Sequence, residues 1–338
     1  MGLSTQTLNC NVIPAQLAMG KTMVIFQATS ASSLPSDSEV RCRLAQNDVI
    51  ICDRISGNNS AVINWQTAEL PAGLTVQRRF ASPCPLPPAS LPLAPGVDPS
   101  SSFVLSSFGS QGTNFDDNHM SAARLVADGG VVVIDNRGSF GCFGYELQVV
   151  ELSGVSVTRG VGSLAVGQRQ TTVGGLPAAS LNTVVLNQQL ASGIASSTSV
   201  CNVLVRTELA SNTSVLFRRG SNNPLLIACS NVTIAELPFE RVDFGARARV
   251  QTFSMNLVSN TTDVPIQQVD GTRTLVFASG QVVGGQGSGE SAYDNTNDDS
   301  ISTGQVRLEL VTNSMVRVTR ARSQSTVTIT FFVVELEP

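Results

Sequence analysis

The chain has 338 residues, of which 42% are hydrophobic and 14% are charged, and its formal net charge is -4. This weakly acidic balance excludes a nucleic-acid binder with a dense basic face, and the hydrophobic fraction excludes a wholly disordered chain. No apolar run approaches the roughly 20 residues of a membrane-spanning helix, so we expect no membrane partner. One histidine, two tyrosines and one tryptophan offer little material for catalysis, and we expect no enzyme.

The N-terminal segment lacks the features of a secretory signal peptide. It has neither a basic head nor an apolar stretch of roughly 7–15 residues. We therefore expect a protein that is made in a cytoplasm. Residues 1–20 are expected to form an arm that contacts other subunits.

Strands are predicted along the whole chain, because β-branched residues and short clusters of turn-forming residues dominate while helix formers are scarce. One pattern recurs four times: an apolar strand ending in Arg, a polar turn, and an apolar strand ending in Glu-Leu. The paired residues are Arg54 and Glu69, Arg137 and Glu151, Arg219 and Glu236, and Arg320 and Glu335. We interpret each pair as opposite charges on adjacent hairpin strands that help to fix the register. Catalysis is the weaker interpretation, because four copies of one active site in a chain would be unusual.

Two more matched strands precede each recurrence, which gives five or six strands per repeat. Without helices to cover a face, such sheets must pack on one another. The sequence predicts an all-β fold of four tandem β-sandwich-like repeats, each of about 80–100 residues. The expected boundaries are 1–70, 71–152, 153–237 and 238–338, arranged as two similar halves of about 1–157 and 158–338.

Residues 82–95 are rich in proline, and we interpret them as an extended crossover or arm inside the second repeat. The seven cysteines include no C-x-x-C pair, and a single histidine cannot complete a zinc site with them. We interpret the cysteines as buried reduced thiols. Disulfides between modules or between subunits, formed after release, are the alternative.

Loops in the second and fourth repeats carry Gln-Gly followed by a cluster of Asp and Asn, which supports the division into two halves. The acidic residues are Asp116, Asp117, Asp294, Asp298 and Asp299. Closely spaced carboxylate and amide oxygens suit Ca²⁺, although neither cluster matches an EF-hand loop. A solvated loop, a calcium site and a contact with a partner or glycan all remain open. We expect no other cofactor.

A short motif in the second repeat carries a resemblance to a known group of proteins. Val149-Val-Glu-Leu152, followed by Val155-Ser-Val-Thr-Arg-Gly160, resembles modules of tailed-bacteriophage virion proteins. The resemblance covers the repeats and implies a structural part of the virion: a tail or head fibre, a decoration protein or a tail-associated subunit. It carries over no functional residue.

We therefore expect a structural, non-enzymatic virion protein that binds copies of itself and other virion proteins. Two alternatives stay open. One is a carbohydrate-binding or cell-adhesion module that contacts a host-surface glycan or receptor, with calcium held by the Asp loops. The other is a subunit of a cell-surface filament or layer.

Overall fold

The structure of the protein is a computed structural model. It describes residues 2–3, 7–11, 16–32, 34–70, 72–81, 89–110, 121–136, 142–188, 190–192, 204–219, 233–279, 301–323 and 326–337. Strands dominate these residues, and the only helices among them are short, which confirms the all-β fold. Within the described ranges, no helix is long and apolar enough to cross a membrane.

Four consecutive stretches of chain, called here sandwiches 1 to 4, each form two antiparallel sheets. Sandwich 1 contains β1 (Gly2–Leu3), β2 (Thr7–Asn11), β3 (Thr22–Ser30), β4 (Arg41–Gln46), β5 (Val49–Asp53) and β6 (Ala61–Glu69). Sandwich 2 contains β7 (Leu74–Ala81), β8 (Ala89–Pro92), β9 (Ser102–Ser110), β10 (Ser121–Leu125), β11 (Val131–Asn136) and β12 (Cys142–Leu152).

The second half of the chain follows the same plan. Sandwich 3 contains β13 (Ser156–Leu164), β14 (Gln170–Val173), β15 (Thr183–Asn187), β16 (Leu190–Ser192), β17 (Val205–Ser211), β18 (Ser214–Arg219) and β19 (Thr233–Asp243). Sandwich 4 contains β20 (Ala248–Leu257), β21 (Thr261–Pro265), β22 (Thr274–Ala278), β23 (Val306–Thr312), β24 (Met315–Arg320) and β25 (Val327–Leu336). Short helices are η1 (Met19–Lys21), α1 (Pro35–Ser38), η4 (Gly271–Arg273) and α2 (Ile301–Gly304).

The strand order is the same in all four sandwiches. One sheet, the inner sheet, has the orders β1-β6-β3, β7-β12-β9, β13-β19-β15 and β20-β25-β22. The other, the outer sheet, has the orders β2-β5-β4, β8-β11-β10, β14-β18-β17 and β21-β24-β23. The short strand β16 adds to the third inner sheet by pairing with β19.

One boundary and two segments differ from the sequence-based expectation. Strand β19 continues through residue 237, the expected end of the third repeat, to Asp243. The expected N-terminal arm contributes β1 and β2, which pair with β6 and β5. The Pro-rich segment, of which residues 89–95 are described, supplies β8 as an edge strand beside β11.

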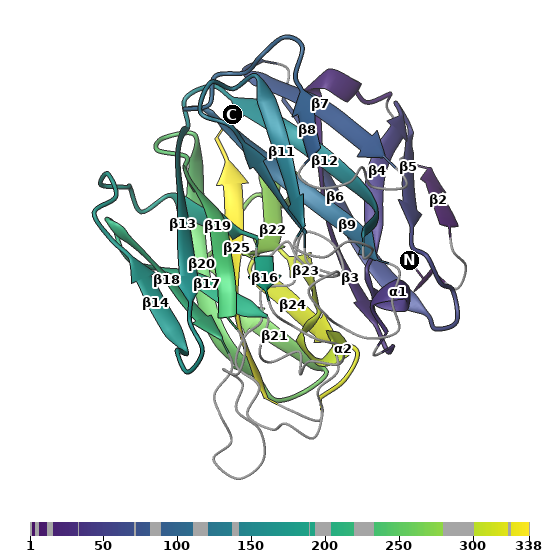
Figure 1. Ribbon diagram of the computed structural model, residues 1–338. Helices are drawn as coiled ribbons and strands as arrows, with labels where there is room; N and C mark the ends of the chain where they lie inside the picture. Colours follow the sequence, from purple (N-terminus) through teal and green to yellow (C-terminus); the bar gives the residue numbers. More distant parts are fainter. Residues whose placement is uncertain are drawn as a thin grey trace.

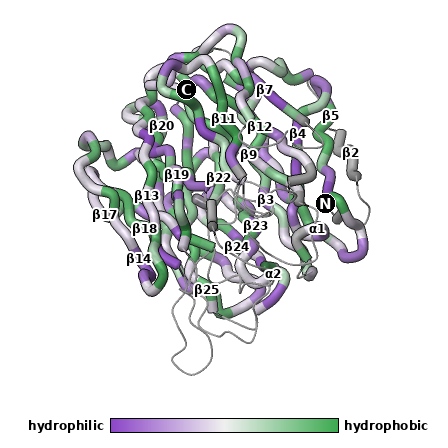
Figure 2. The backbone as a smooth tube through the Cα atoms, in the orientation of Figure 1, coloured by the Kyte–Doolittle hydropathy of each residue, from purple (hydrophilic) through white to green (hydrophobic). Residues whose placement is uncertain are grey.

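Each sandwich encloses its own core between the two sheets, represented by Phe26, Leu147, Phe217 and Phe331. A further cluster, the shared core, takes residues from all four inner sheets, among them Ile25, Val150, Val242 and Val334. Three inner strands are buried on both faces: every residue of β3, β15 and β22 is buried, whereas β5 of an outer sheet alternates between buried and half-buried residues. Figure 2 shows this as long hydrophobic stretches on some strands and alternating colours on others.

The shared core shows that the sandwiches are packed around one another and do not form a rod of beads. In Figure 1 the purple and blue strands of sandwiches 1 and 2 lie beside the green and yellow strands of sandwiches 3 and 4. Strand contacts join sandwich 1 to 2, 2 to 3, 3 to 4 and 4 back to 1. The arrangement is closed, and sandwich 4 packs directly on sandwich 1 through β22 and β23 against β3.

Candidate functional site

The structure describes only some of the residues that the sequence singled out. Asp116, Asp117, Asp294, Asp298, Asp299 and Arg137 lie outside the described residues. Within the described part of the chain, no group of three or more His, Cys, Asp or Glu side chains is placed to hold a metal ion. The candidate site must therefore be built from other residues.

The hairpin interpretation is wrong for the Arg and Glu pairs of which the structure describes both residues. Arg219 lies on β18 of an outer sheet and Glu236 on β19 of an inner sheet, and Arg320 and Glu335 are divided in the same way. Likewise, β5, which ends just before Arg54, belongs to an outer sheet, and β6 with Glu69 belongs to an inner sheet. Two residues on different sheets are not cross-strand neighbours, so they do not set a common register.

The arginines instead hold loops at one end of their sandwiches. Arg54, Arg219 and Arg320 are each at most 3% exposed. Arg54 Nη1 donates to the carbonyl oxygen of Asp37 at 2.6 Å. Arg219 Nε donates to Gln168 O at 2.7 Å, and Arg320 Nε donates to Ser259 O at 3.0 Å. Burial lowers the pKa of Arg219 to about 10, so the guanidinium remains charged at neutral pH.

The carboxylates have a separate and repeated role. The register aligns Glu69, Glu151, Asp243 and Glu335, because each is paired with the first residue of the third strand: Thr22, Ser102, Thr183 and Thr274. Asp243 therefore replaces Glu236 as the equivalent residue in sandwich 3. Each carboxylate accepts a backbone N–H from the turn before that strand: Ala18 (3.3 Å), Asp98 (3.1 Å), Ser180 (2.7 Å) and Asp270 (2.6 Å).

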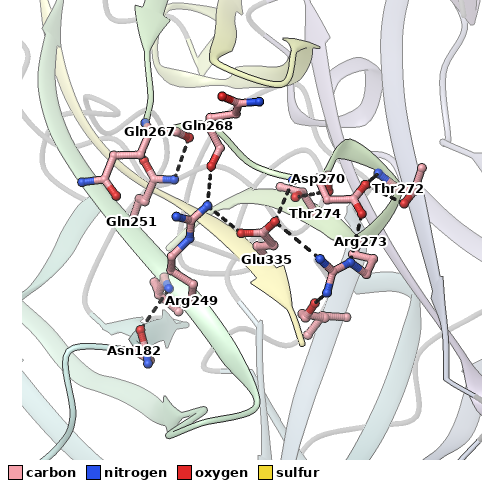
Figure 3. Close-up of polar contacts among 12 residues, drawn as sticks. Asn182, Arg249, Gln251, Gln267, Gln268, Asp270, Thr272, Arg273, Thr274 and Glu335 are labelled. Carbon is pink, nitrogen blue, oxygen red and sulfur yellow. Dashed lines mark hydrogen bonds and ion pairs between the residues drawn. The ribbon is translucent and has the colours of Figure 1, made fainter. Parts of the chain in front are cut away.

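The carbonyl oxygen of the same turn residue is also hydrogen-bonded. The hydroxyl of the first strand residue donates to the carbonyl oxygen of the same turn residue: Thr22 to Ala18, Ser102 to Asp98, Thr183 to Ser180 and Thr274 to Asp270, at 2.6–2.9 Å. Figure 3 shows the version in sandwich 4, where Glu335 also forms an ion pair with Arg249 at 2.6 Å. Hydrogen bonds from Thr272, followed by one from Arg273, lower the pKa of Asp270 to about 2.

Polar side chains three residues before these carboxylates join neighbouring sandwiches; Gln148 and Glu240 are buried, and Gln66 is half-buried. Gln148 accepts from Val24 N at 2.8 Å, Glu240 from Val104 N at 2.6 Å and Gln66 from Val276 N at 2.9 Å. In each case the side chain satisfies the backbone of the edge strand in the preceding sandwich, with sandwich 4 preceding sandwich 1. The equivalent residue of sandwich 4 is Phe332, which has no polar atom to offer.

Two arginines reinforce these contacts. Arg78 of β7 donates to the carbonyl oxygens of Met19 and Thr22, and Arg159 of β13 donates to those of Pro99 and Ser102. Arg159 also pairs with Glu240, with a distance of 2.9 Å from Nε to Oε1. Burial raises the pKa of Glu240, and Arg159 opposes that effect.

A second buried carboxyl lies between sandwiches 1 and 2. Burial raises the pKa of Glu146 to about 8, although Arg43, Arg78 and Arg41 act in the opposite direction. On the sandwich 1 side of the interface, Arg41 and Arg43 pair with Asp53. The Arg43 guanidinium also reaches across to sandwich 2 and stacks on the Phe80 ring, 4.0 Å from its centroid. At neutral pH this interface therefore holds a largely protonated glutamate among charged arginines.

The interface between sandwiches 2 and 3 forms an open pocket of about 370 Å³. Its lining is mainly apolar and includes Leu125, Val133 and Val161, with Arg159 and Glu240 contributing polar atoms. Val161 aligns with Phe80, since each lies two residues after the arginine that contacts the preceding turn. The smaller side chain leaves open the space that Phe80 occupies in the previous interface.

A larger cleft of about 690 Å³ lies between sandwiches 1 and 4. Seven consecutive residues, 64–70, form one wall, and residues of η4, β22 and β23 form the other. The chain's single tryptophan, Trp65, lines the cleft together with Glu69, Arg273 and Glu309. Trp65 also packs against the core of sandwich 1. Backbone edges, carboxylates and a guanidinium in one cleft suit an extended polar ligand better than a compact apolar one.

Sequence reasoning missed the residues that build this site. Gln66, Gln148 and Glu240 recur at one position relative to the aligned carboxylates, which was a detectable signal. This recurrence was hidden because the sequence comparison matched Glu236 of sandwich 3, and not Asp243, with Glu69, Glu151 and Glu335. No known protein family matches the chain, and no curated protein matches it either.

Proposed function

We propose that the protein is a structural, non-enzymatic subunit of a virion that assembles with copies of itself and with other virion proteins. The observation that carries the proposal is the shared core, which joins all four inner sheets. Hydrogen bonds that Gln148, Glu240 and Gln66 accept from backbone N–H groups reinforce three of the contacts between sandwiches. A closed block of this kind suits a building unit that transmits load without changing shape.

The virion setting is supported by the resemblance of the β12 and β13 segments to modules of tailed-bacteriophage virion proteins. Sheet edges offer natural contact points, because their unpaired backbone groups can bond to another chain. Light scattering with negative-stain imaging tests the proposal. We expect a discrete closed ring, trimer or fibre. A monodisperse monomer at every concentration would contradict self-assembly.

A second candidate function is carbohydrate binding in cell adhesion, which is favoured by the position of Trp65 in the polar cleft. An aromatic face beside hydrogen-bonding groups suits a sugar ring, which has both apolar and polar surfaces. Binding to immobilised glycans, with and without a chelator, tests it. Glycan binding that Trp65→Ala abolishes would support the function, and a melting temperature that chelation leaves unchanged would exclude a role for calcium in stability.

A further inference from the structure

Strand β6 differs from its three equivalents in the partner on one side. β7 pairs with β12 from Leu74↔Leu152 to Ala81↔Tyr145, and β13 and β20 pair with β19 and β25 over similar lengths. In sandwich 1, β1 pairs with Ala61 and Val62 only. Among the described residues, no strand pairs with residues 64–69 of β6 on this side.

The exposure of β6 reflects this difference. Residues 64–67 are all half-buried. The equivalent residues of sandwich 2, Glu146 to Val149, are at most 3% exposed, and those of sandwich 4, Thr330 to Val333, are at most 1% exposed. The same position in the fold is therefore covered in two other sandwiches and partly open in sandwich 1.

The open side carries backbone hydrogen-bonding groups. Leu70 N donates to Lys21 O, on the side of β6 that faces β3. Backbone groups of a strand alternate in direction. Those of Trp65, Thr67 and Glu69 are accordingly directed to the opposite side, and all three residues line the cleft.

Two of the three strands that occupy this position elsewhere share a side-chain pattern, whereas β20 has Thr252 in place of the arginine, opposite Phe332. In β7 the pattern is Leu74-x-Val76-x-Arg78, and around the start of β13 it is Val155-x-Val157-x-Arg159. The apolar residues pack on the shared core. The arginine is opposite Gln148 in one case and Glu240 in the other, and it donates to two carbonyls of the preceding turn.

The cleft presents the matching groups in sandwich 4. Met19 and Pro99 stand three residues before the third strand of their sandwiches, and the equivalent residue is Gly271. Thr274 is equivalent to Thr22 and Ser102. Gly271 and Thr274 both line the cleft, opposite Gln66. Its charged lining comprises Glu69, Glu309 and Glu337 against Arg273, which favours a basic occupant.

We propose that the open edge of β6 binds an extended segment of a partner protein as an antiparallel strand, with the pattern apolar-x-apolar-x-Arg and its arginine opposite Gln66. Backbone bonds to β6 supply affinity, and the alternating side chains supply specificity. The inference rests on the proposed function, because it names the chemistry of the partner through which the assembly grows.

A synthetic peptide with the sequence of residues 73–81 is the probe, and Trp65 is the reporter because it is the only tryptophan. We expect a saturable change in tryptophan fluorescence. A peptide with Gln in place of the residue 78 arginine should bind at least about 10-fold more weakly, since hydrogen bonds from charged groups are lost. A peptide with its apolar and polar positions exchanged should not bind. Equal binding of all three peptides, or none by the first, would overturn the proposal.

Variants of the protein locate the strand. Thr67→Pro removes an N–H on the open side, without removing a bond to β3, and should abolish binding while the far-ultraviolet spectrum is unchanged. Thr67→Ala keeps the N–H and is the matched control. If Thr67→Pro fails to fold, protection of the Thr67 and Glu69 amides from hydrogen exchange by the peptide replaces it. Unprotected amides would contradict the proposal.

An extension of the chain gives an independent measurement. Continuing the register Gly2↔Val62 backwards, the sequence of residues 74–80 fused directly before Met1 places its first arginine opposite Gln66. This variant should melt at a higher temperature than the unfused protein and should no longer bind the free peptide. A Gly-Ser fusion of equal length should do neither. A fusion that melts no higher than the Gly-Ser control would count against the proposal.

The outcomes separate this inference from the proposed function. An oligomer that does not bind the peptide would overturn the inference and leave the assembly function intact. A monomer that binds the peptide would support the inference and contradict self-assembly. A fluorescence response to soluble oligosaccharides, without a response to the peptide, would overturn the inference in favour of glycan binding.

Discussion

Residue 240 shows how the same position in the fold can use a charged or a neutral side chain. Glu240 occupies the place that Gln66 and Gln148 occupy in sandwiches 1 and 2, and all three accept a backbone N–H from the preceding sandwich. Only Glu240 pairs directly with the neighbouring arginine, Arg159. Arg78 instead interacts electrostatically with the separate carboxyl of Glu146, an interaction that opposes the effect of burial on the pKa of each group.

Replacing Glu240 should therefore separate the hydrogen bond from the charge. Glu240→Gln keeps an acceptor for Val104 N and should cost about 1–2 kcal/mol of unfolding free energy. Glu240→Ala leaves a buried N–H and a partly buried guanidinium without this partner and should cost about 3–5 kcal/mol. Urea unfolding measures both. Equal losses for the two variants would show that the acceptor for Val104 N is not what matters.

Glu146 gives a prediction about pH. Its pKa is raised by burial from 4.5 to about 8, so the folded protein keeps a proton that the unfolded chain releases above about pH 4.5. The contribution of this group to stability is complete at lower pH and is lost as the pH rises through about 8. Stability measured in urea should fall across this window, and Glu146→Gln should flatten the fall. A wild-type stability that rises from pH 5 to 8 and is unaffected by the substitution would refute this assignment.

At the scale of elements, the outer sheet of sandwich 1 contains a disulfide that the sequence did not predict. Cys42 on β4 is directly opposite Cys52 on β5, with a Cα–Cα distance of 4.1 Å, and both residues are completely buried. The interpretation of both as reduced thiols is wrong for this pair. Each cysteine takes an apolar position of its strand, and that position gives no sign of which other strand will be its neighbour.

Reduction of this bond should weaken sandwich 1. Closing a loop of this length contributes about 2–3 kcal/mol, chiefly by restricting the unfolded chain. The urea midpoint should therefore fall under reducing conditions, and Cys42→Ala/Cys52→Ala should show the lower midpoint whether or not reductant is present. A wild-type midpoint that reductant does not change would contradict the assignment.

The sequence is informative about strands and much less so about how sheets are shared. Alternation and turn signals predict β5, β18 and β24 well, because each lies in an outer sheet with one buried face. They do not reveal that the next strand along the chain belongs to the inner sheet of the same sandwich. Local sequence patterns do not specify which sheet a strand joins. The cleft was beyond prediction, because it arises where β6 lacks a partner that β12, β19 and β25 possess.

The whole molecule is expected to respond as a unit to changes in the shared core. Val150 is completely buried in this cluster, which also contains residues of the other three inner sheets, whereas Val258 is 70% exposed. Val150→Ala should cost about 2–3 kcal/mol and lower the melting temperature of every sandwich together. Val258→Ala is the matched control and should change little. Loss of structure confined to sandwich 2, seen by hydrogen exchange, would argue for independent units.

Differential scanning calorimetry of the intact chain tests the central claim most directly. If the four inner sheets share one core, the protein should unfold in a single transition whose calorimetric and van't Hoff enthalpies agree. Four sandwiches that merely follow one another along the chain would instead melt separately. Two or more resolved transitions, or a calorimetric enthalpy several times the van't Hoff value, would contradict the closed four-sandwich block.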